Sequence, residues 1–476
     1  MLDNPHATPA PDNFDVTIDG VTVPLTQELL ERYDVPGPRY TSYPTAPMWS
    51  DDFGAADARR VISASNETGA PLSLYMHLPF CERLCLFCGC NVIVSHKHDK
   101  AEPYLATLMR ELELLADVVD TSRPVVQFHW GGGTPTYFTP EQLERLFTFT
   151  QERFTFADDA EIGVEIDPRV TTDEHLTMLR RVGFNRLSMG VQDFDPAVQE
   201  AIRRIQTVEQ VGAMVERCRE LGFDSVNLDL IYGLPLQTAA GFARTLEHVV
   251  ALDPDRIAMF SYGHVPWIKK QQRVLTDLLP THEEKFRIFR TGISHLTNAG
   301  YTYVGMDHFA RPDDELCVAQ RDGTLHRNFQ GYTTKAGADL LGAGITSIGQ
   351  IGHAYTQNRR DVDGWRAAIE NDELPCFRGI ELNDDDVIRQ DAIGEILCHT
   401  ALDKVEFGRR HGIDVDSYFA ESLARLKPLA DDGLVTLDDD AIRATPLGRI
   451  FLRNIAMAFD AYLDRPSDRP MFSRTL

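Results

Sequence analysis

The stretch LSLYMHLPFCERLCLFCGCN, residues 72–91, joins an apolar segment directly to four of the eight cysteines of this 476-residue chain. Residues 72–80 have the composition of a buried β-strand. Four cysteines follow with the spacing C-x3-C-x2-C-x-C, at Cys81, Cys85, Cys88 and Cys90. In α/β barrels the functional residues gather in the loops that follow the strands. The stretch therefore favours a barrel in which residues 72–80 form the first strand.

The sequence after the cysteines alternates between strand-like and helix-like segments. Strand-like segments lie at 125–133, 161–167, 186–192, 225–233 and 256–263, separated by stretches with helical apolar spacing. With residues 72–80 they make six strands, which predicts an α/β fold, a partial (β/α)6-type TIM-like barrel or a full one. From 283 to about 350 the alternation is irregular, and we expect loops there that close the site.

A chain of this length is expected to contain two or three domains. We expect an N-terminal extension that covers the active site over residues 1–50, the barrel with its closing loops over 51–355, and a mainly helical domain over 356–476. Helical patterns dominate from about residue 383, and residues 434–445, LVTLDDDAIRAT, have the pattern of two short strands around an acidic turn. Helices followed by a small hairpin are typical of a winged-helix arrangement.

The composition argues against several classes of partner. The formal net charge is −25, whereas nucleic acid and anionic membrane surfaces require a basic face. A redox-sensing regulator of nucleic acid, which the winged-helix pattern suggests, is disfavoured because the hairpin turn is acidic. No apolar run approaches the ~20 residues of a membrane helix, and residues 1–15 lack the basic and apolar regions of a signal peptide. We expect a monomer in the cytoplasm, with no nucleic acid or membrane partner.

Clustered cysteines in such a chain indicate metal binding or catalysis rather than structural disulfides. Zinc sites commonly use two separated C-x2-C pairs, and no second pair is present. A redox disulfide and a purely structural cluster are further alternatives. Thiolates close together on a loop can each bind a different iron of a 4Fe–4S cluster, which is the chemistry that we favour. The other cysteines are scattered singly, as packed core residues are: Cys218, Cys317, Cys376 and Cys398.

Polar or glycine residues lie at or near the ends of the later predicted strands. They are Gly131 to Thr134, Glu165 with Asp167, Gln192, Asp229 and Gly263. Parallel strands present these ends at one rim, so we expect a ligand to be bound there. Each residue also has a structural interpretation: the glycines as a tight turn, Glu165 as a helix cap or surface carboxylate, and Asp229 as a carboxylate paired with a neighbour. Arg204 is either a solvated helix charge or a clamp for a carboxylate.

The C-x3-C-x2-C core resembles that of the radical S-adenosylmethionine (SAM) enzymes. From about residue 30 to the C-terminus the chain is similar to one family among them, the oxygen-independent coproporphyrinogen III oxidases. The segments that carry this similarity are GPRYTSYPT, YMHLPFCERLCLFCGCN, HWGGGTPTY, EIDPR, NRLSMGVQDF, NLDLIYGLPLQT and GMDHFARPDDELCVAQRDGTLHRNFQGYTT. Related heme chaperones share the barrel but normally have an aromatic residue after the third cysteine, where this chain has Gly89, Cys90 and Asn91.

The resemblance implies a specific reaction and cofactor set. Two propionate side chains of coproporphyrinogen III would be oxidatively decarboxylated to vinyl groups by a 5′-deoxyadenosyl radical, giving protoporphyrinogen IX in heme biosynthesis. Cys81, Cys85 and Cys88 would hold a 4Fe–4S cluster with one iron open to SAM, Cys90 would lie beside it, and no side chain would be catalytic beyond the cluster and SAM. Two SAM molecules are implied, the first contacted by Tyr75, Gly132, Glu165 and Ile348, the second by Gly133, Thr134, Gln192, Arg204, Asp229 and Gly263. Gly263 stands where the family has alanine, a small-for-small difference compatible with a backbone contact.

The implied substrate carries four carboxylates, so we expect basic groups near the barrel mouth. The candidates are Arg39, His308, Arg311, Arg321, His326 and Arg327, unless these are ordinary loop charges paired with acids such as Asp313 and Asp314. The segment GPRYTSYPT is expected to fold over the active site. The sequence identifies neither the electron donor nor the electron acceptor. A heme chaperone without oxidase activity and a heme-opening radical methyltransferase are the alternative functions.

Overall fold

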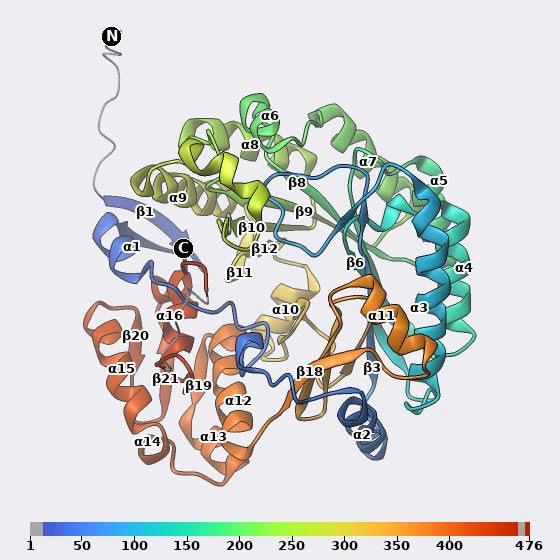
Figure 1. Cartoon of the computed structure of the whole chain (residues 1–476). Helices are drawn as coiled ribbons and strands as arrows, with labels where there is room; N and C mark the ends of the chain where they lie inside the picture. The colour runs from blue at the N-terminus through green and yellow to red at the C-terminus, as the bar shows by residue number, and fades with distance from the viewer. Residues whose placement is uncertain (1–12, 465–471) are drawn as a thin grey trace.

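The central feature of the computed structural model is a 12-stranded sheet with the strand order β11-β12-β10-β9-β8-β7-β6-β3-β15-β16-β17-β18 (Figure 1). The structure describes residues 13–464 and 472–476. Six strands in the middle of the sheet run parallel and neighbour one another in chain order. They are β3 (Leu72–Leu78), β6 (Val125–Gly132), β7 (Phe156–Ile166), β8 (Arg186–Gln192), β9 (Ser225–Tyr232) and β10 (Arg256–Ser261). The prediction of six parallel strands is confirmed.

The helices between these strands pack on the outside of the curved sheet (Figure 1). They are α3 (Ala101–Ala116), α4 (Pro140–Gln151), α5 (Asp173–Val182), α6 (Pro196–Ile202), α7 (Val208–Leu221) and α8 (Ala239–Leu252), with α9 (His282–Asn298) after β10. Five of them begin after a threonine whose hydroxyl accepts a hydrogen bond from the backbone N–H three residues later: Thr139, Thr172, Thr207, Thr238 and Thr281. Such caps satisfy a donor that the helix itself leaves free, and each stabilises its helix by about 1 kcal/mol.

Short strands extend the sheet on both sides of the parallel core. β15 (Asp339–Ala343) adds a further parallel strand beside β3, followed by the antiparallel strands β16 (Ile348–Ile351), β17 (Ala354–Asn358) and β18 (Cys376–Glu381). On the other side, β12 (His308–Ala310) and β11 (Thr302–Gly305) are antiparallel to their neighbours. The sheet is therefore a partial barrel. The sequence predicts closing loops from 283 to about 350, whereas the structure has short strands there. The strands were missed because segments this short show no recognisable hydrophobic period.

The remaining elements of the first 380 residues are small. The N-terminal part contains the hairpin β1 (Asn13–Ile18) and β2 (Val21–Thr26), then α1 (Gln27–Tyr33) and α2 (Ala55–Ser65). The pair β4 (Phe80–Cys81) and β5 (Ile93–Val94) brackets the cysteine loop. Later come α10 (Glu315–Arg321), the hairpin β13 (His326–Asn328) and β14 (Gly331–Thr333), and α11 (Val362–Glu370).

The last part of the chain is mainly helical, as expected. It contains α12 (Asp384–His399), α13 (Lys404–His411), α14 (Val415–Tyr418), α15 (Ala420–Asp431) and α16 (Leu452–Met457). A three-stranded sheet joins β19 (Ala401–Asp403), β21 (Ala441–Ala444) and β20 (Val435–Leu437). The boundary expected at residue 355 falls within β17, since the sheet continues to β18. The division into three domains stays a prediction.

The segment GPRYTSYPT lies between the sheet and the C-terminal helices. Tyr40 donates a hydrogen bond to Asp460 (2.9 Å), and the Tyr43 ring packs edge-on against Tyr462. Residues 40–43 also line a cavity of about 450 Å³ together with residues from 323–327 and α12. Among the described residues no helix is both long and apolar enough to cross a membrane.

A buried ion pair holds β15 beside the start of the parallel core. The Arg123 guanidinium donates a hydrogen bond to the Asp339 carboxylate, and the two side chains are 3% and 8% exposed, respectively. Removing one member leaves the other charge buried and unpaired, which costs about 3–5 kcal/mol. We therefore expect Asp339→Ala to lower the free energy of unfolding by roughly that amount in urea denaturation.

The matched control is Asp438→Ala, which removes an acid that pairs with Arg443 at the surface. Exposed pairs contribute about 1 kcal/mol or less. Equal effects of the two substitutions would contradict a structural role for the buried pair.

Candidate active site

A cavity of about 260 Å³ lies at the carboxyl ends of the parallel strands, directly beneath the cysteine loop. The strand ends converge there because all six strands point the same way. Its walls are formed mainly by charged, polar and sulfur-containing residues: Cys81, Arg83, Cys85, Cys88, Cys90, Gly132, Gly133, Thr134, Glu165, Asp167, Arg169, Ser188, Gln192, Arg204 and Asp229, with apolar Phe87 and Phe260. Ten of the thirteen site residues expected from the sequence are therefore brought together.

The cysteine loop is held in place by backbone carbonyls that accept hydrogen bonds from one neighbouring segment. Lys269 Nζ bonds the carbonyl of Cys90 (2.6 Å), Gln271 Nε2 that of Cys88 (2.9 Å) and Gln272 Nε2 that of Phe87 (2.8 Å). Gln271 and Gln272 belong to the 3-10 helix η5 (Lys270–Leu278). The irregular loop keeps its shape because these donors replace the pairing of a regular strand.

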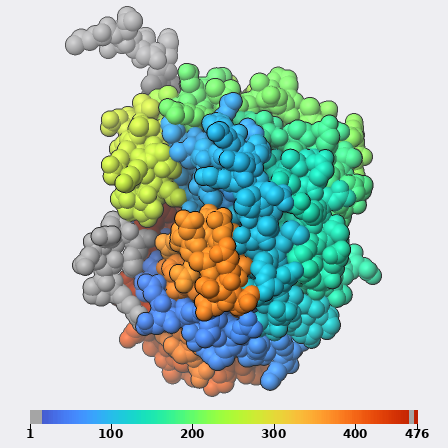
Figure 2. All heavy atoms as spheres, turned by 45° about the vertical axis from the view of Figure 1, so that its right-hand side comes forward, coloured from blue at the N-terminus to red at the C-terminus, as the bar shows by residue number. Residues whose placement is uncertain are grey.

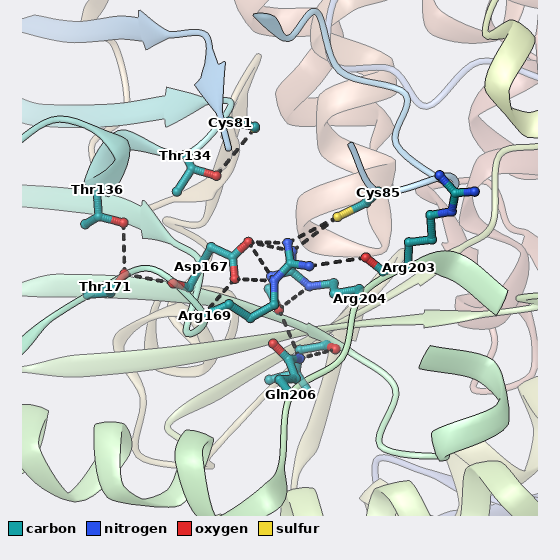
Figure 3. Close-up of polar contacts among 12 residues, drawn as sticks. Cys81, Cys85, Thr134, Thr136, Asp167, Arg169, Thr171, Arg203, Arg204 and Gln206 are labelled. Carbon is teal, nitrogen blue, oxygen red and sulfur yellow. Dashed lines mark hydrogen bonds and ion pairs between the residues drawn. The ribbon is translucent and has the colours of Figure 1, made fainter. Parts of the chain in front are cut away.

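A cluster of charged groups surrounds the second cysteine (Figure 3). Cys85 Sγ lies 3.3 Å from Arg169 Nη2 and 3.6 Å from Arg204 Nη1. Asp167 accepts hydrogen bonds from both arginines, at 2.6 Å from Arg169 and 2.9 Å from Arg204. Burial raises the pKa of Asp167, but the two guanidinium groups outweigh it and lower the pKa to about 2. The carboxylate thus fixes two cations beside a thiol that would carry negative charge as a ligand.

The other thiols differ in environment. Cys81 lies 3.5 Å from the Thr134 hydroxyl, and burial raises its pKa to about 12. The hydrogen bond that Cys90 donates lowers the pKa of Cys88 and raises that of Cys90. Within the described ranges, no three or more His, Cys, Asp or Glu side chains converge on a single metal position. Cluster thiolates bind separate irons, so three cysteines on one cavity wall still suit an iron–sulfur cluster.

Another part of the cavity lining combines a carboxylate with a glycine turn at the end of β6. Gly132 donates its backbone N–H to Glu165 Oε2 (3.2 Å), and His129 Nε2 lies 3.6 Å from Glu165 Oε1. Burial raises the pKa of Glu165, whereas His129 and the Gly132 N–H lower it. The lowering effects are larger together, so the pKa lies below its ordinary value. Gly132 has φ +117°, and a Cβ there would lie 2.7 Å from the ring of His77. Only glycine fits this turn.

Asp229 lies on β9 at the floor of the cavity. Asn227 Nδ2 donates to its Oδ1 (2.7 Å) and Ser188 Oγ to its Oδ2 (3.1 Å). Burial, with the negative charge of Glu165, raises the pKa of Asp229 to about 7. The pairing with a neighbour that the sequence left open is present, and the carboxylate still faces the cavity.

Three expected SAM contacts do not line the cavity. Tyr75 on β3 stacks on His129 with ring centroids 6.1 Å apart, and its hydroxyl lies 3.1 Å from His77 Nδ1. The Gly263 carbonyl accepts a hydrogen bond from Gln272 (3.2 Å). Ile348 on β16 packs in a separate cluster with Trp49 and Tyr355. Conversely, Arg169 was not singled out, although the segment EIDPR places it two residues after Asp167.

The expected substrate-binding groups fall into two sets. Arg311 pairs with Asp253, and Arg321 donates to the Pro312 carbonyl at the surface (2.8 Å). Arg39 pairs with Asp307 (2.9 Å) and lies over the ring of Phe260, which borders the 260 Å³ cavity.

In the second set, His308 and Arg327 have buried side-chain nitrogens, whereas His326 is exposed. The His308 ring meets Phe260 and Tyr332 edge-on, and Arg327 lies 4.9 Å over the Tyr332 ring. Arg327 Nε and Nη1 and His308 Nδ1 are buried without a hydrogen-bond partner among the described residues. Burial and the charge of Arg327 lower the pKa of His308 to about 4. Arg327 and the exposed His326 line the 450 Å³ cavity.

Comparisons with known proteins agree over nearly the whole chain. Residues 75–249 match the radical SAM superfamily, and residues 383–451 match the HemN C-terminal domain. The oxygen-independent coproporphyrinogen III oxidase of Synechocystis sp. is 44% identical over 96% of this chain and 99% of its own, and that of Escherichia coli is 47% identical over 94% and 98%. The solved structure of coproporphyrinogen III oxidase (HemN) from Escherichia coli, described as a radical SAM enzyme, superposes with a TM-score of 0.88 at 45% identity over 94% of this chain and 100% of that one.

The raised pKa of Asp229 predicts a pH dependence of stability. Between its ordinary value of 3.8 and about 7, the carboxyl is protonated in the folded state and ionised in the unfolded state. The free energy of unfolding therefore falls as pH rises through this window, by at most about 1.4 kcal/mol per pH unit. We expect Asp229→Asn to flatten the decline between pH 5 and 7 in thermal unfolding. Asp224→Asn, at an exposed carboxylate nearby, should leave it unchanged, and equal slopes in wild type and Asp229→Asn would refute the assignment.

Proposed function

This chain belongs to the family of oxygen-independent coproporphyrinogen III oxidases in the radical SAM superfamily, and we propose that it converts two propionate side chains of coproporphyrinogen III to vinyl groups. The product would be protoporphyrinogen IX, a precursor of heme. The observation that carries this proposal is 44–47% identity over nearly the full length of relatives with that name. The heme chaperone alternative receives no comparable support.

We propose that Cys81, Cys85 and Cys88 hold the 4Fe–4S cluster that the superfamily implies. The bound cluster, together with SAM, supplies the organic radical needed to remove hydrogen from an unactivated C–H bond. Around it, Arg169 and Arg204 donate toward Cys85, which offsets negative charge on that thiolate. Cys90, exposed at the end of the loop, is proposed to lie outside the ligand set.

The number of SAM molecules is a finer proposal. We propose two, because the family resemblance implies a second molecule and the cavity carries polar groups, such as Arg204 and Asp229, beyond those at the Gly132 turn. Glu165 and the Gly132 turn would contact the first molecule, with Tyr75 and Ile348 beyond the cavity edge. The second would be contacted by Gly133, Thr134, Gln192, Arg204, Asp229 and Gly263. Arg204 suits a carboxylate, and Asp229 suits an ammonium or ribose hydroxyl.

Binding of the substrate carboxylates is proposed for the interior basic groups rather than the surface ones. Arg327 has two buried guanidinium nitrogens without a partner, and a buried unpaired donor is costly unless a ligand satisfies it. Arg311 and Arg321 already have partners on the protein. The cytoplasmic location and the monomeric state stay predictions. The reaction also requires an electron donor and an electron acceptor.

The test of the function uses anaerobically reconstituted protein with coproporphyrinogen III, SAM and a reductant. We expect consumption of SAM and release of two molecules of carbon dioxide per protoporphyrinogen IX. Tight binding of heme without any carbon dioxide would instead support a heme carrier.

The ligand assignment predicts different outcomes for neighbouring cysteines. Cys85→Ser should lose the cluster, measured as iron and inorganic sulfide per chain, and carbon dioxide release should fall to background. Cys90→Ser, in the same loop, is the matched control and should retain iron, sulfide and most of its activity. Full iron content in Cys85→Ser, or complete loss in Cys90→Ser, would overturn the assignment.

The substrate assignment predicts a difference between two arginines. Arg327→Ala should raise KM for coproporphyrinogen III about tenfold or more, because a buried charged hydrogen bond contributes at least ~1.4 kcal/mol. Arg321→Ala, six residues earlier at the surface, should leave KM within about twofold. The cluster content of both variants checks that the barrel is intact, and an unchanged KM in Arg327→Ala would reject the assignment.

A further inference from the structure

A group of exposed apolar side chains surrounds the outer edge of the cysteine loop. Ten large apolar residues are strongly exposed in the described part of the chain, and six of them lie on this rim. They are Ile205 (67% exposed), Leu236 (48%), Trp267 (51%), Ile268 (66%), Val274 (65%) and Leu278 (40%), and we call them the rim patch. Scattered exposed apolar residues need no explanation, but a concentration of them marks an interaction surface.

The rim patch is continuous with the loop that carries the cysteines. Leu86 donates its N–H to the carbonyl of Ile202, close to Ile205, and Leu236 donates to Leu278 (2.8 Å). Figure 2 shows the yellow-green segment that contains η5 beside the blue segment that contains the loop, on one face of the molecule. The inner side of η5 is used by the fold, since Leu275 packs with Leu86 and Phe87. On its outer side, Val274 and Leu278 are 65% and 40% exposed.

Unpaired positive charge accompanies the apolar side chains. Residues 267–278 contain three basic residues, Lys269, Lys270 and Arg273, and one acidic residue, Asp277. Arg83 and Arg203 are exposed close by, so basic groups outnumber this acid. None of these five basic groups forms an ion pair with another described residue. This is unusual in a chain in which Asp and Glu outnumber Lys and Arg by 72 to 47. The surface is therefore complementary to an acidic partner.

We propose that the rim patch is the docking surface for an acidic iron–sulfur protein that carries one electron. The inference rests on the proposed function, because it requires the cluster at Cys81, Cys85 and Cys88. In the step itself, one electron leaves the reduced iron–sulfur centre of the carrier and enters the cluster of this chain. The carrier is oxidised by one electron and the cluster reduced by one, with no bond formed or broken. Docking on the rim places the carrier against the loop that holds the electron acceptor.

The test uses a reduced plant-type ferredoxin, an acidic iron–sulfur protein of low reduction potential, and the anaerobic cluster-containing chain. Binding is measured by calorimetry, and cluster reduction by the loss of its visible absorbance, both without substrate. We expect Lys270→Glu with Arg273→Glu, and separately Trp267→Ser with Val274→Ser, to weaken binding and slow reduction about tenfold. Reduction by dithionite, which needs no docking surface, should keep its rate.

The matched control is Arg59→Glu with Lys427→Glu, two exposed basic residues on α2 and α15, which should change neither quantity. Salt should weaken ferredoxin binding to the wild type and not to the charge-reversed variant. The proposal would be overturned if the rim variants bound ferredoxin as the wild type does, or if ferredoxin reduced their cluster at the wild-type rate. Equal slowing of reduction by dithionite would also overturn it. An effect confined to KM for coproporphyrinogen III would do so as well, because it would make the rim part of the substrate site. Because binding and cluster reduction are both measured without substrate, failure of these two measurements is distinguishable from failure of the oxidase function.

Discussion

The common direction of the six central strands is the constraint on which the site depends. Parallel pairing places every strand's carboxyl end at the same rim, so residues that are 50 to 150 positions apart in sequence become neighbours. Cys85, which follows β3, meets Arg169, just beyond β7, and Arg204, beyond β8. Asp167 then fixes the spacing of the two guanidinium groups. An antiparallel sheet would send alternate loops to opposite ends, and this constellation could not form.

The electrostatics of the cavity follow from how each charge is balanced. Asp167 is compensated by two arginines and stays ionised, whereas Asp229 has only an amide and a hydroxyl beside it and lies near Glu165. The two carboxylates therefore differ in pKa by several units, because one faces cations and the other faces neutral donors and a like charge. A ligand that brings a positive group close to Asp229 would ionise it. The cavity is thus ready for a zwitterionic ligand without carrying a large net charge itself.

Sequence patterns predicted the parts of the fold that have long, regular elements. The six parallel strands and the cysteine loop were recognised because each strand has several apolar residues in succession and each helix a clear period. The flanking strands β11, β12, β15 and β16 were not, because three to five residues are too few for a pattern. At the site, motif positions grouped most of the cavity residues correctly. Arg169 was overlooked because an arginine after a strand has no spacing rule, and its role is visible only through its contacts with Asp167 and Cys85.

The threonine caps of the outer helices and the glycine turn at the end of β6 have opposite consequences for how such a chain can diverge. Each cap acts on its own helix, so its loss costs about 1 kcal/mol and is absorbed locally. A Cβ atom at Gly132 would clash with the His77 ring, so any other residue there would displace the neighbouring residues of the site. We infer that substitutions are tolerated in the outer layer of the barrel and excluded at its inner edge, so that the outer helices can change while the geometry of the site is kept.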